Sequence, residues 1–108
     1  MEREDPLTPG VALSVVAPAY DEAPNLDALA GQVRAALQPL GIAWELVIVD
    51  DGSADDTPAV LARLAAADPR IRPLRLPARS GQTAALAAGF HAARGALIAT
   101  LDADLQCP

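Results

Sequence analysis

Two aspartates one residue apart, in the stretch Asp102-Ala103-Asp104, follow the last apolar run of this chain. Residues two apart on an extended segment point to the same side, so both carboxylates would face one edge of the fold. At a separation of about 6 Å and an effective dielectric of about 20, their repulsion costs roughly 2–3 kcal/mol. Such a pair is tolerated when a cation lies beside it or when one carboxyl stays protonated. Oxygen ligands without a nearby histidine favour Mg²⁺ or Mn²⁺ over zinc, and substrate phosphates commonly complete the coordination of such an ion.

Two further acidic clusters follow earlier apolar runs. Tyr20-Asp21-Glu22 follows the first run, and Asp50-Asp51-Gly52-Ser53 follows the second. Neighbours on a strand face opposite ways, so one of Asp50 and Asp51 would point into a site while the other caps the turn, and the sequence leaves open which does which. A solvated turn at a strand end also explains a single Asp-x-Asp pattern. Three clusters at one predicted edge favour a metal-bridged diphosphate site instead.

The segments that would position these clusters alternate between short apolar runs and helical spacing. Such alternation gives right-handed crossovers, so we predict an α/β protein, a Rossmann-like parallel sheet with flanking helices and strand order 3-2-1-4. The first, second and fourth runs are continuously apolar, as expected where helices cover both faces of a sheet, whereas Pro73 suits an edge strand. The strands are expected over Leu13–Ala17, Leu46–Val49, Ile71–Leu76 and Ala96–Leu101, and the helices over Asn25–Leu37, Thr57–Ala67 and Gln82–Arg94.

The side chains of the third predicted helix also carry expectations. Leu86 and Phe90 would face the sheet, and small residues such as Gly89 would permit close packing. His91 would be exposed beside a buried Phe90. Trp44, which opens the second strand, is expected to pack in the core rather than to bind substrate.

Composition narrows the classes of function. The chain has 108 residues, which is one small domain or part of a larger one. A net charge of −6 argues against nucleic-acid partners. The single cysteine, Cys107, cannot form an internal disulfide and fits a reducing cytosol, and no apolar run approaches the roughly twenty residues that span a bilayer. We expect a cytoplasmic protein in which residues 1–12 are extended or disordered.

Four stretches, taken in order, resemble the nucleotide-binding half of family 2 glycosyltransferases of the GT-A fold. They are LSVVAPAYDEAPNL, ELVIVDDGSADDT, GQTAALAAGFHAARG and TLDADLQCP. Within that family they are most similar to the dolichyl-phosphate mannosyltransferase and bacterial prenyl-phosphate glycosyltransferase branch. The resemblance implies that residues 13–108 are the N-terminal, nucleotide-sugar-binding half of a GT-A domain, without its acceptor half.

The resemblance also implies which residues bind the nucleoside of the donor. Pro18, Tyr20 and Glu22 would hold it, with Tyr20 against the base or ribose and Glu22 accepting a hydrogen bond from a hydroxyl. Ile48 and Asp50 would line the base pocket, where Asp50 would accept a hydrogen bond from an N–H group of the base.

The same resemblance assigns the catalytic metal site. Asp102, Ala103 and Asp104 would form the Asp-x-Asp element, with both carboxylates on the metal and the diphosphate. Gln106 is similar to an additional metal ligand of the mannosyltransferase branch. Family members usually carry an acidic residue where Cys107 stands, and a thiol cannot replace a carboxylate on a hard metal ion. The departure bears on the geometry of the acceptor side.

The implied activity is an inverting, metal-dependent transfer of a sugar from a GDP- or UDP-sugar to an acceptor such as a polyprenyl phosphate or a glycan. A longer form would work at the inner face of the cell membrane and would contact it only through parts that this chain lacks. The alternative is a catalytically incomplete fragment that acts as a nucleotide-binding or interaction module. Arg79 would either approach the diphosphate or be a solvated loop arginine, and helix capping explains Gln82-Thr83 as well as substrate contact does.

Overall fold

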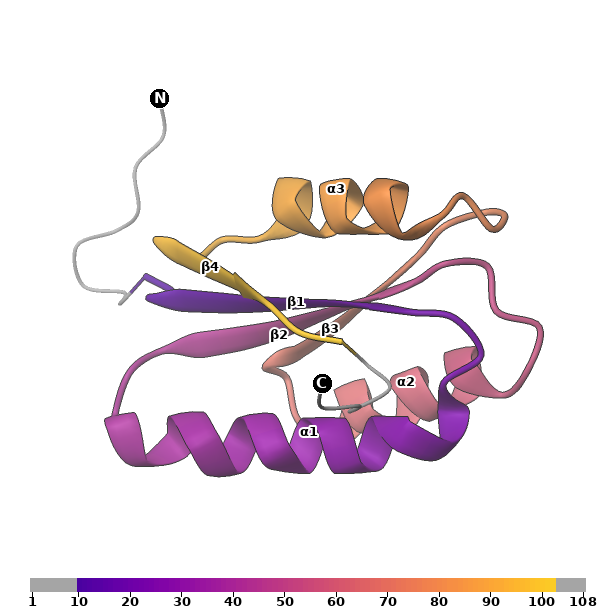
Figure 1. Cartoon of the computed structure of the whole chain (residues 1–108). Helices are drawn as coiled ribbons and strands as arrows, with labels where there is room; N and C mark the ends of the chain where they lie inside the picture. Colours follow the sequence, from indigo (N-terminus) through magenta and orange to yellow (C-terminus); the bar gives the residue numbers. More distant parts are fainter. Residues whose placement is uncertain (1–9, 103–108) are drawn as a thin grey trace.

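The computed structural model describes residues 10–102 of the chain. Four parallel strands form one sheet in the order β3-β2-β1-β4, which confirms the predicted topology (Figure 1). The bounds of the elements agree with the predicted ones to within two residues. The strands are β1 (Leu13–Ala19), β2 (Trp44–Asp50), β3 (Ile71–Arg75) and β4 (Leu97–Thr100); the helices are α1 (Ala23–Leu37), α2 (Thr57–Ala67) and α3 (Gln82–Ala92), with a short 3₁₀ helix η1 (Gln38–Leu40) after α1.

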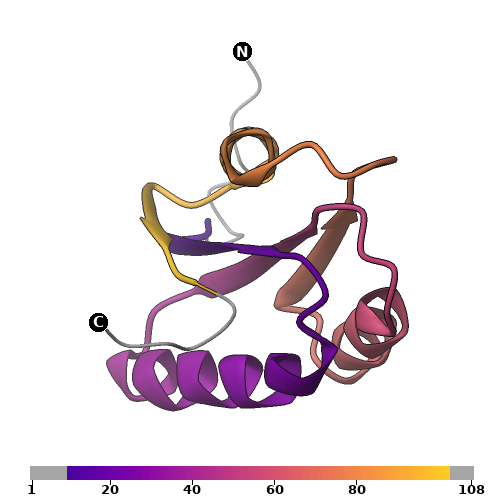
Figure 2. The ribbon, with the colours of Figure 1, turned by 45° about the vertical axis from the view of Figure 1, so that its right-hand side comes forward.

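Helices α1 and α2 cover one face of the sheet, and α3 covers the other (Figures 1 and 2). Successive side chains of a strand point to opposite faces. Accordingly Val15 and Ala17 of β1 lie in the larger core beneath α1 and α2, whereas Val16 lies in the smaller core beneath α3. Burial of this apolar surface is the main stabilising contribution to such a fold. Within residues 10–102, no helix is both long and apolar enough to cross a bilayer.

The central strand β2 is buried along its whole length. Its first residue, Trp44, packs in the larger core, as predicted, and the guanidinium carbon of Arg70 lies 4.2 Å from the centroid of its ring. A cation over an aromatic face adds a modest electrostatic attraction. Trp44 therefore closes the core near the amino ends of the strands.

Helix α3 approaches the sheet most closely through small residues, and the prediction that Phe90 faces the sheet is wrong. Ala85 and Gly89 are buried, whereas Phe90 is 44% exposed and Leu86 is only partly buried. A Cβ atom at Gly89 would overlap Cγ1 of Val16, so the absence of a side chain allows the close approach. The predicted close packing and the exposure of His91 are confirmed. Leu86 packs against the margin of the smaller core, whereas Phe90 lies on the outer side of the helix.

The fourth strand was expected beneath helices on both faces, and that expectation is wrong. All four residues of β4 are exposed, and Leu97 is 70% exposed. The strand pairs with β1 from Leu13↔Leu97 to Val16↔Thr100, and no described residue pairs with its outer side. Strand β3 with Pro73 forms the opposite edge of the sheet, as predicted.

Candidate functional site

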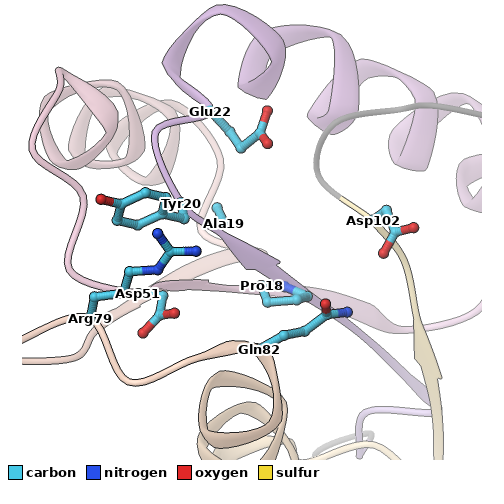
Figure 3. A pocket seen from close by; sticks show the side chains of 8 residues that line it. All are labelled: Pro18, Ala19, Tyr20, Glu22, Asp51, Arg79, Gln82 and Asp102. Atoms are coloured by element: carbon cyan, nitrogen blue, oxygen red, sulfur yellow. The ribbon is translucent and has the colours of Figure 1, made fainter.

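A pocket of about 420 Å³ lies at the carboxyl end of β1 (Figure 3). The last pair between β1 and β4 is Val16↔Thr100, so the rest of β1 extends beyond its neighbour on that side. This place is the topological switch point of the sheet, where open α/β sheets bind their ligands. The residues that line the pocket are Pro18, Ala19, Tyr20, Glu22, Asp51, Arg79, Gln82 and Asp102.

Four of the predicted site residues, Pro18, Tyr20, Glu22 and Asp102, line this one pocket. They come from two segments about eighty positions apart along the sequence. The parallel sheet brings them together because the carboxyl ends of its strands meet at one edge. The other predicted residues are placed differently: Ile48 and Asp50 do not line the pocket, and Ala103, Asp104 and Gln106 lie outside the described residues.

The loop after β1 is joined to the loop after β2 by hydrogen bonds. The Asp21 N–H donates to Ser53 Oγ at 2.8 Å, and Asp21 Oδ1 accepts from the Ala54 N–H at 2.9 Å. The next N–H, that of Glu22, donates to Thr57 Oγ1 at 3.1 Å. Asp21 has a left-handed backbone with φ of +52°, which aspartate tolerates better than most residues. The two loops therefore form one support for the side chains on either side of Asp21.

Ile48 and Asp50 lie beneath the surface of the site. Ile48 is fully buried in the larger core. Asp50 is 1% exposed, and its two carboxylate oxygens accept hydrogen bonds from the Ser53 N–H at 2.9 Å and from Arg75 Nη1 at 2.8 Å. Asp50 is thus the aspartate that caps the turn after β2.

Asp51 is the aspartate that faces the pocket, a choice that the sequence left open. Its Oδ1 accepts the Ser80 N–H at 2.7 Å, and its Oδ2 accepts the Gly81 N–H at 2.9 Å. The carboxylate therefore fastens the loop before α3 to the end of β2. Gly52 has φ of +74°, and a Cβ there would overlap the backbone nitrogen of Arg79. Glycine at this position lets the loop come close enough for Asp51 to hold it.

The fastened loop places Arg79 over Tyr20. The guanidinium carbon lies 3.8 Å from the centroid of the Tyr20 ring, and Figure 3 shows the two side chains together, with Asp102 on the other side of the pocket in this view. This arrangement is a cation–π contact. Arg79 is exposed, but its guanidinium lies against the Tyr20 ring and forms no ion pair with a carboxylate of residues 10–102. Gln82, for which capping and substrate contact were both open, lines the same pocket and makes no side-chain cap bond to α3.

The charges around the pocket are mostly acidic. Glu22, Asp51 and Asp102 contribute carboxylates, whereas Arg79 is the one basic residue of the lining. Asp102 is exposed and offers hard oxygen ligands of the kind that Mg²⁺ and Mn²⁺ prefer. Within residues 10–102, no three His, Cys, Asp or Glu side chains gather closely enough to hold a metal ion. A complete metal site would therefore need ligands from beyond Asp102.

Fold and pocket together define an α/β protein of the doubly wound type with a ligand site at its switch point. Residues 14–108 match the family described as Glycosyl transferase family 2. Because this match covers most of the chain, the protein belongs to glycosyl transferase family 2, which confirms the resemblance found in the sequence.

Individual relatives are consistent with this assignment. The undecaprenyl-phosphate 4-deoxy-4-formamido-L-arabinose transferase of Salmonella paratyphi A is 43% identical over 97 residues, which are 89% of this chain and 30% of the relative. Among solved structures, the mannosyltransferase PcManGT from Pyrobaculum calidifontis, in complex with GDP-Man and Mn²⁺, has a TM-score of 0.72 and 27% identity, over 93% of this chain and 29% of its own. The mannosyl-3-phosphoglycerate synthase from Rubrobacter xylanophilus shares the fold, with a TM-score of 0.72 and 20% identity over 87% of this chain and 31% of its own. The chain thus spans about 30% of the length of the curated relatives that it matches.

Proposed function

We propose that residues 13–108 are the donor-binding half of a glycosyltransferase that transfers a sugar from a GDP- or UDP-sugar to a polyprenyl phosphate. The observation that carries the proposal is the pocket at the carboxyl end of β1, which combines the ring of Tyr20 with the carboxylates of Glu22 and Asp102. Its support is family membership, together with a relative named as an undecaprenyl-phosphate sugar transferase and a neighbour solved with GDP-Man and Mn²⁺.

The nucleoside would bind at the side of the pocket formed by β1 and the start of α1. Tyr20 would pack against the base or ribose, because an aromatic ring offers a large flat apolar surface. Glu22 would accept a hydrogen bond from a hydroxyl, and Pro18 would form the floor of this part of the pocket. Ile48 and Asp50, which are buried, would support the base pocket from below.

The metal ion would be held by Asp102, Asp104 and Gln106, next to the diphosphate. When bound, Mg²⁺ or Mn²⁺ would neutralise the charge that develops on the leaving diphosphate. Asp102 fits such a role because it is an exposed carboxylate on the lining of the pocket. Ala103 would continue the backbone of this element between the two aspartates.

The chemical step would invert the configuration of the sugar. An oxygen of the acceptor forms a bond to the anomeric carbon on the face opposite the diphosphate. The bond from that carbon to the diphosphate oxygen breaks, and its electron pair leaves with the nucleoside diphosphate. The oxygen of a polyprenyl phosphate is already anionic and needs little help from a base, whereas a glycan hydroxyl would need a carboxylate base. A lipid acceptor would place the longer protein at the inner face of the cell membrane.

Calorimetric titration of the 108-residue chain with GDP and UDP, each with Mn²⁺, tests the proposal. We expect binding by the wild type, weaker binding by Tyr20→Ala, and loss of the Mn²⁺-dependent part in Asp104→Ala. Asp27→Ala is the matched control, because Asp27 is an exposed carboxylate on α1 that does not line the pocket. Equal nucleotide affinity in Tyr20→Ala, Asp104→Ala and the wild type would refute donor binding at this pocket.

The exposed strand β4 favours a second candidate, in which the chain is a catalytically incomplete nucleotide-binding or interaction module. All four residues of the strand are exposed, and they lie at the edge of the sheet. Sedimentation velocity and thermal unfolding, run with and without nucleotides, distinguish the candidates. A stable, cooperatively melting chain that ignores GDP and UDP would favour an interaction module.

A further inference from the structure

Arg79 differs from every other arginine of residues 10–102. Six of the seven arginines in this part of the chain form ion pairs with carboxylates, whereas Arg79 has neither an ion pair nor a side-chain hydrogen bond to a described residue. It is also the one basic residue that lines the pocket. Its five N–H donors are therefore available to a ligand. The paired arginines are Arg34, Arg63, Arg70, Arg72, Arg75 and Arg94.

We propose that Arg79 binds the diphosphate of the nucleotide by exchanging its contact with the Tyr20 ring for hydrogen bonds to phosphate oxygens. This inference rests on the proposed function. A guanidinium donates two parallel hydrogen bonds to phosphate oxygens, and such charge-assisted bonds are stronger than a solvent-exposed cation–π contact. The other charged residues of the lining are acidic, so an incoming diphosphate finds its favourable side-chain charge at Arg79.

The structure separates a fixed backbone from a movable side chain. The loop is held by the two hydrogen bonds from Ser80 and Gly81 to Asp51, and Gly52 packs against the backbone of Arg79. The guanidinium is held by the Tyr20 ring alone among described residues. Exchange of the guanidinium from the ring to the diphosphate therefore requires side-chain rotation and no rearrangement of the loop.

This exchange couples the two parts of a nucleotide. When the diphosphate takes the guanidinium, the face of Tyr20 is uncovered for the base. A nucleoside without phosphates must displace Arg79 from the ring and gives the guanidinium no new partner. Removal of the Arg79 side chain should therefore weaken the binding of nucleoside diphosphates and strengthen the binding of nucleosides.

The test compares Arg79→Ala and Arg79→Lys with the wild-type chain by calorimetric titration of GDP, UDP, guanosine and uridine in the presence of Mg²⁺. In Arg79→Ala we expect about 10- to 100-fold weaker binding of GDP or UDP and about 2- to 5-fold tighter binding of the matching nucleoside. Arg79→Lys keeps the charge but loses the planar fork, so its affinity for the diphosphates should be intermediate. Arg63→Ala is the matched control: Arg63 is exposed, pairs with Asp27, does not line the pocket, and its removal changes the net charge equally.

Tyr20 provides a second readout, because it is the single tyrosine of the chain. In NMR spectra, Mg²⁺-pyrophosphate should shift the Tyr20 ring signals of the wild type by drawing the guanidinium away, and should leave those of Arg79→Ala in place. Equal losses of nucleoside and diphosphate affinity in Arg79→Ala would overturn the inference, since they would make Arg79 a clamp on the base. Unchanged diphosphate affinity in that variant, with binding by the wild type, would overturn it while the proposed function stands. Failure of the wild type to bind any nucleotide would remove the proposed function and the inference together.

Discussion

At the amino ends of the strands Glu45 is buried among polar partners, whereas at the carboxyl ends Asp102 is exposed on the wall of a pocket. Glu45 accepts hydrogen bonds from Ser14 Oγ at 2.6 Å, from Arg72 Nη1 at 2.8 Å and from the Arg94 N–H at 2.7 Å. These partners belong to β1, to β3 and to the segment that joins α3 to β4. Burial opposes ionisation of Glu45, but the hydrogen bonds from Ser14, Arg94 and Arg72 outweigh it and lower the pKa of the carboxyl to about 2.

At the carboxyl ends the carboxylates bind mostly to backbone amides. Asp21 accepts from the loop after β2, and Asp51 accepts from the loop before α3. Asp50, which pairs with Arg75, is the exception, and it lies beneath the pocket. Arginine side chains thus neutralise Glu45 at the amino ends of the strands. At the carboxyl ends, backbone N–H groups bind Asp21 and Asp51 and shape the site without adding a positively charged side chain. The difference indicates that one end of the sheet serves stability and the other serves binding.

The largest effect is expected from Glu45→Gln. The substitution removes the charge that two arginines share, and breaking a buried ion pair from one side costs about 3 kcal/mol or more in unfolding free energy. Urea denaturation measures the loss, and nucleotide affinity should not change. Asp27→Asn is the matched control, because Asp27 pairs with Arg63 at the exposed surface, where such pairs contribute little. Similar losses of unfolding free energy in Glu45→Gln and Asp27→Asn would contradict the proposed role of the amino ends of the strands in stability.

The pH dependence of the unfolding free energy should reflect the ionisation of Glu45. The pKa of Glu45 is lowered from 4.5 to about 2 in the folded chain. A lowered pKa gives stability that is complete above the unfolded value and is lost as the pH falls through the folded value. The unfolding free energy should therefore decrease by about 3 kcal/mol from this carboxyl between pH 5 and pH 2. Urea midpoints measured across that range should fall less steeply for Glu45→Gln, and equal slopes would show that Glu45 does not carry the effect.

Asp68 should account for part of the slope that remains in Glu45→Gln. The hydrogen bond from Arg70 is the main cause that lowers its pKa from 3.8 to about 2, with help from Arg34 and against the effect of burial. It also lies at the amino end of a strand, just before β3. Its contribution has the same sign and is likewise lost on acidification.

A smaller effect on stability is expected from Asp51→Ala. The variant leaves the Ser80 and Gly81 N–H groups without their acceptor, which costs about 1–3 kcal/mol. Hydrogen exchange should show faster loss of protection at these two amides than elsewhere, and GDP affinity should fall because Arg79 is no longer positioned. Asp56→Ala is the control, since Asp56 is exposed and its side chain makes no cap bond to α2. Unchanged exchange at the two amides would contradict the role given to Asp51.

Much of the fold could be predicted because strand and helix periodicities are local properties of the sequence. The alternation of strands and helices predicted the α/β class and the strand order, and Pro73 indicated that β3 is an edge strand. The orientation of α3 could not be predicted in the same way. That helix consists mainly of small apolar residues, and the sheet accepts Ala85 and Gly89 at close range while Phe90 stays outside. An apolar run such as β4 indicates a strand but does not say whether anything covers it.

The site was predictable as far as topology decides it. Parallel strands bring Tyr20, Glu22 and Asp102 to one edge whatever the details of their loops. Whether Asp50 or Asp51 faces the pocket depends on which face of the sheet each of the two side chains points to. The alternation of side chains along a strand does not decide this by itself. The position of Arg79 over Tyr20 depends on loop hydrogen bonds between residues far apart in the sequence, and no local pattern encodes them.

The smallest effect on stability is expected from Asp102→Asn. Asp102 is exposed, and its side chain has no hydrogen bond or ion pair to another described residue, so the unfolding free energy should change by less than about 0.5 kcal/mol. Its Mn²⁺-dependent GDP binding should nevertheless weaken, because an amide is a poorer ligand than a carboxylate for a hard cation. Urea denaturation and calorimetry on the same samples give both quantities, with Asp102→Glu as the variant that keeps the charge. A stability loss comparable with that of Glu45→Gln would place Asp102 among the residues that hold the fold. A loss of Mn²⁺-dependent GDP binding without a loss of stability would show that Asp102, at the carboxyl ends of the strands, serves ligand binding and not folding.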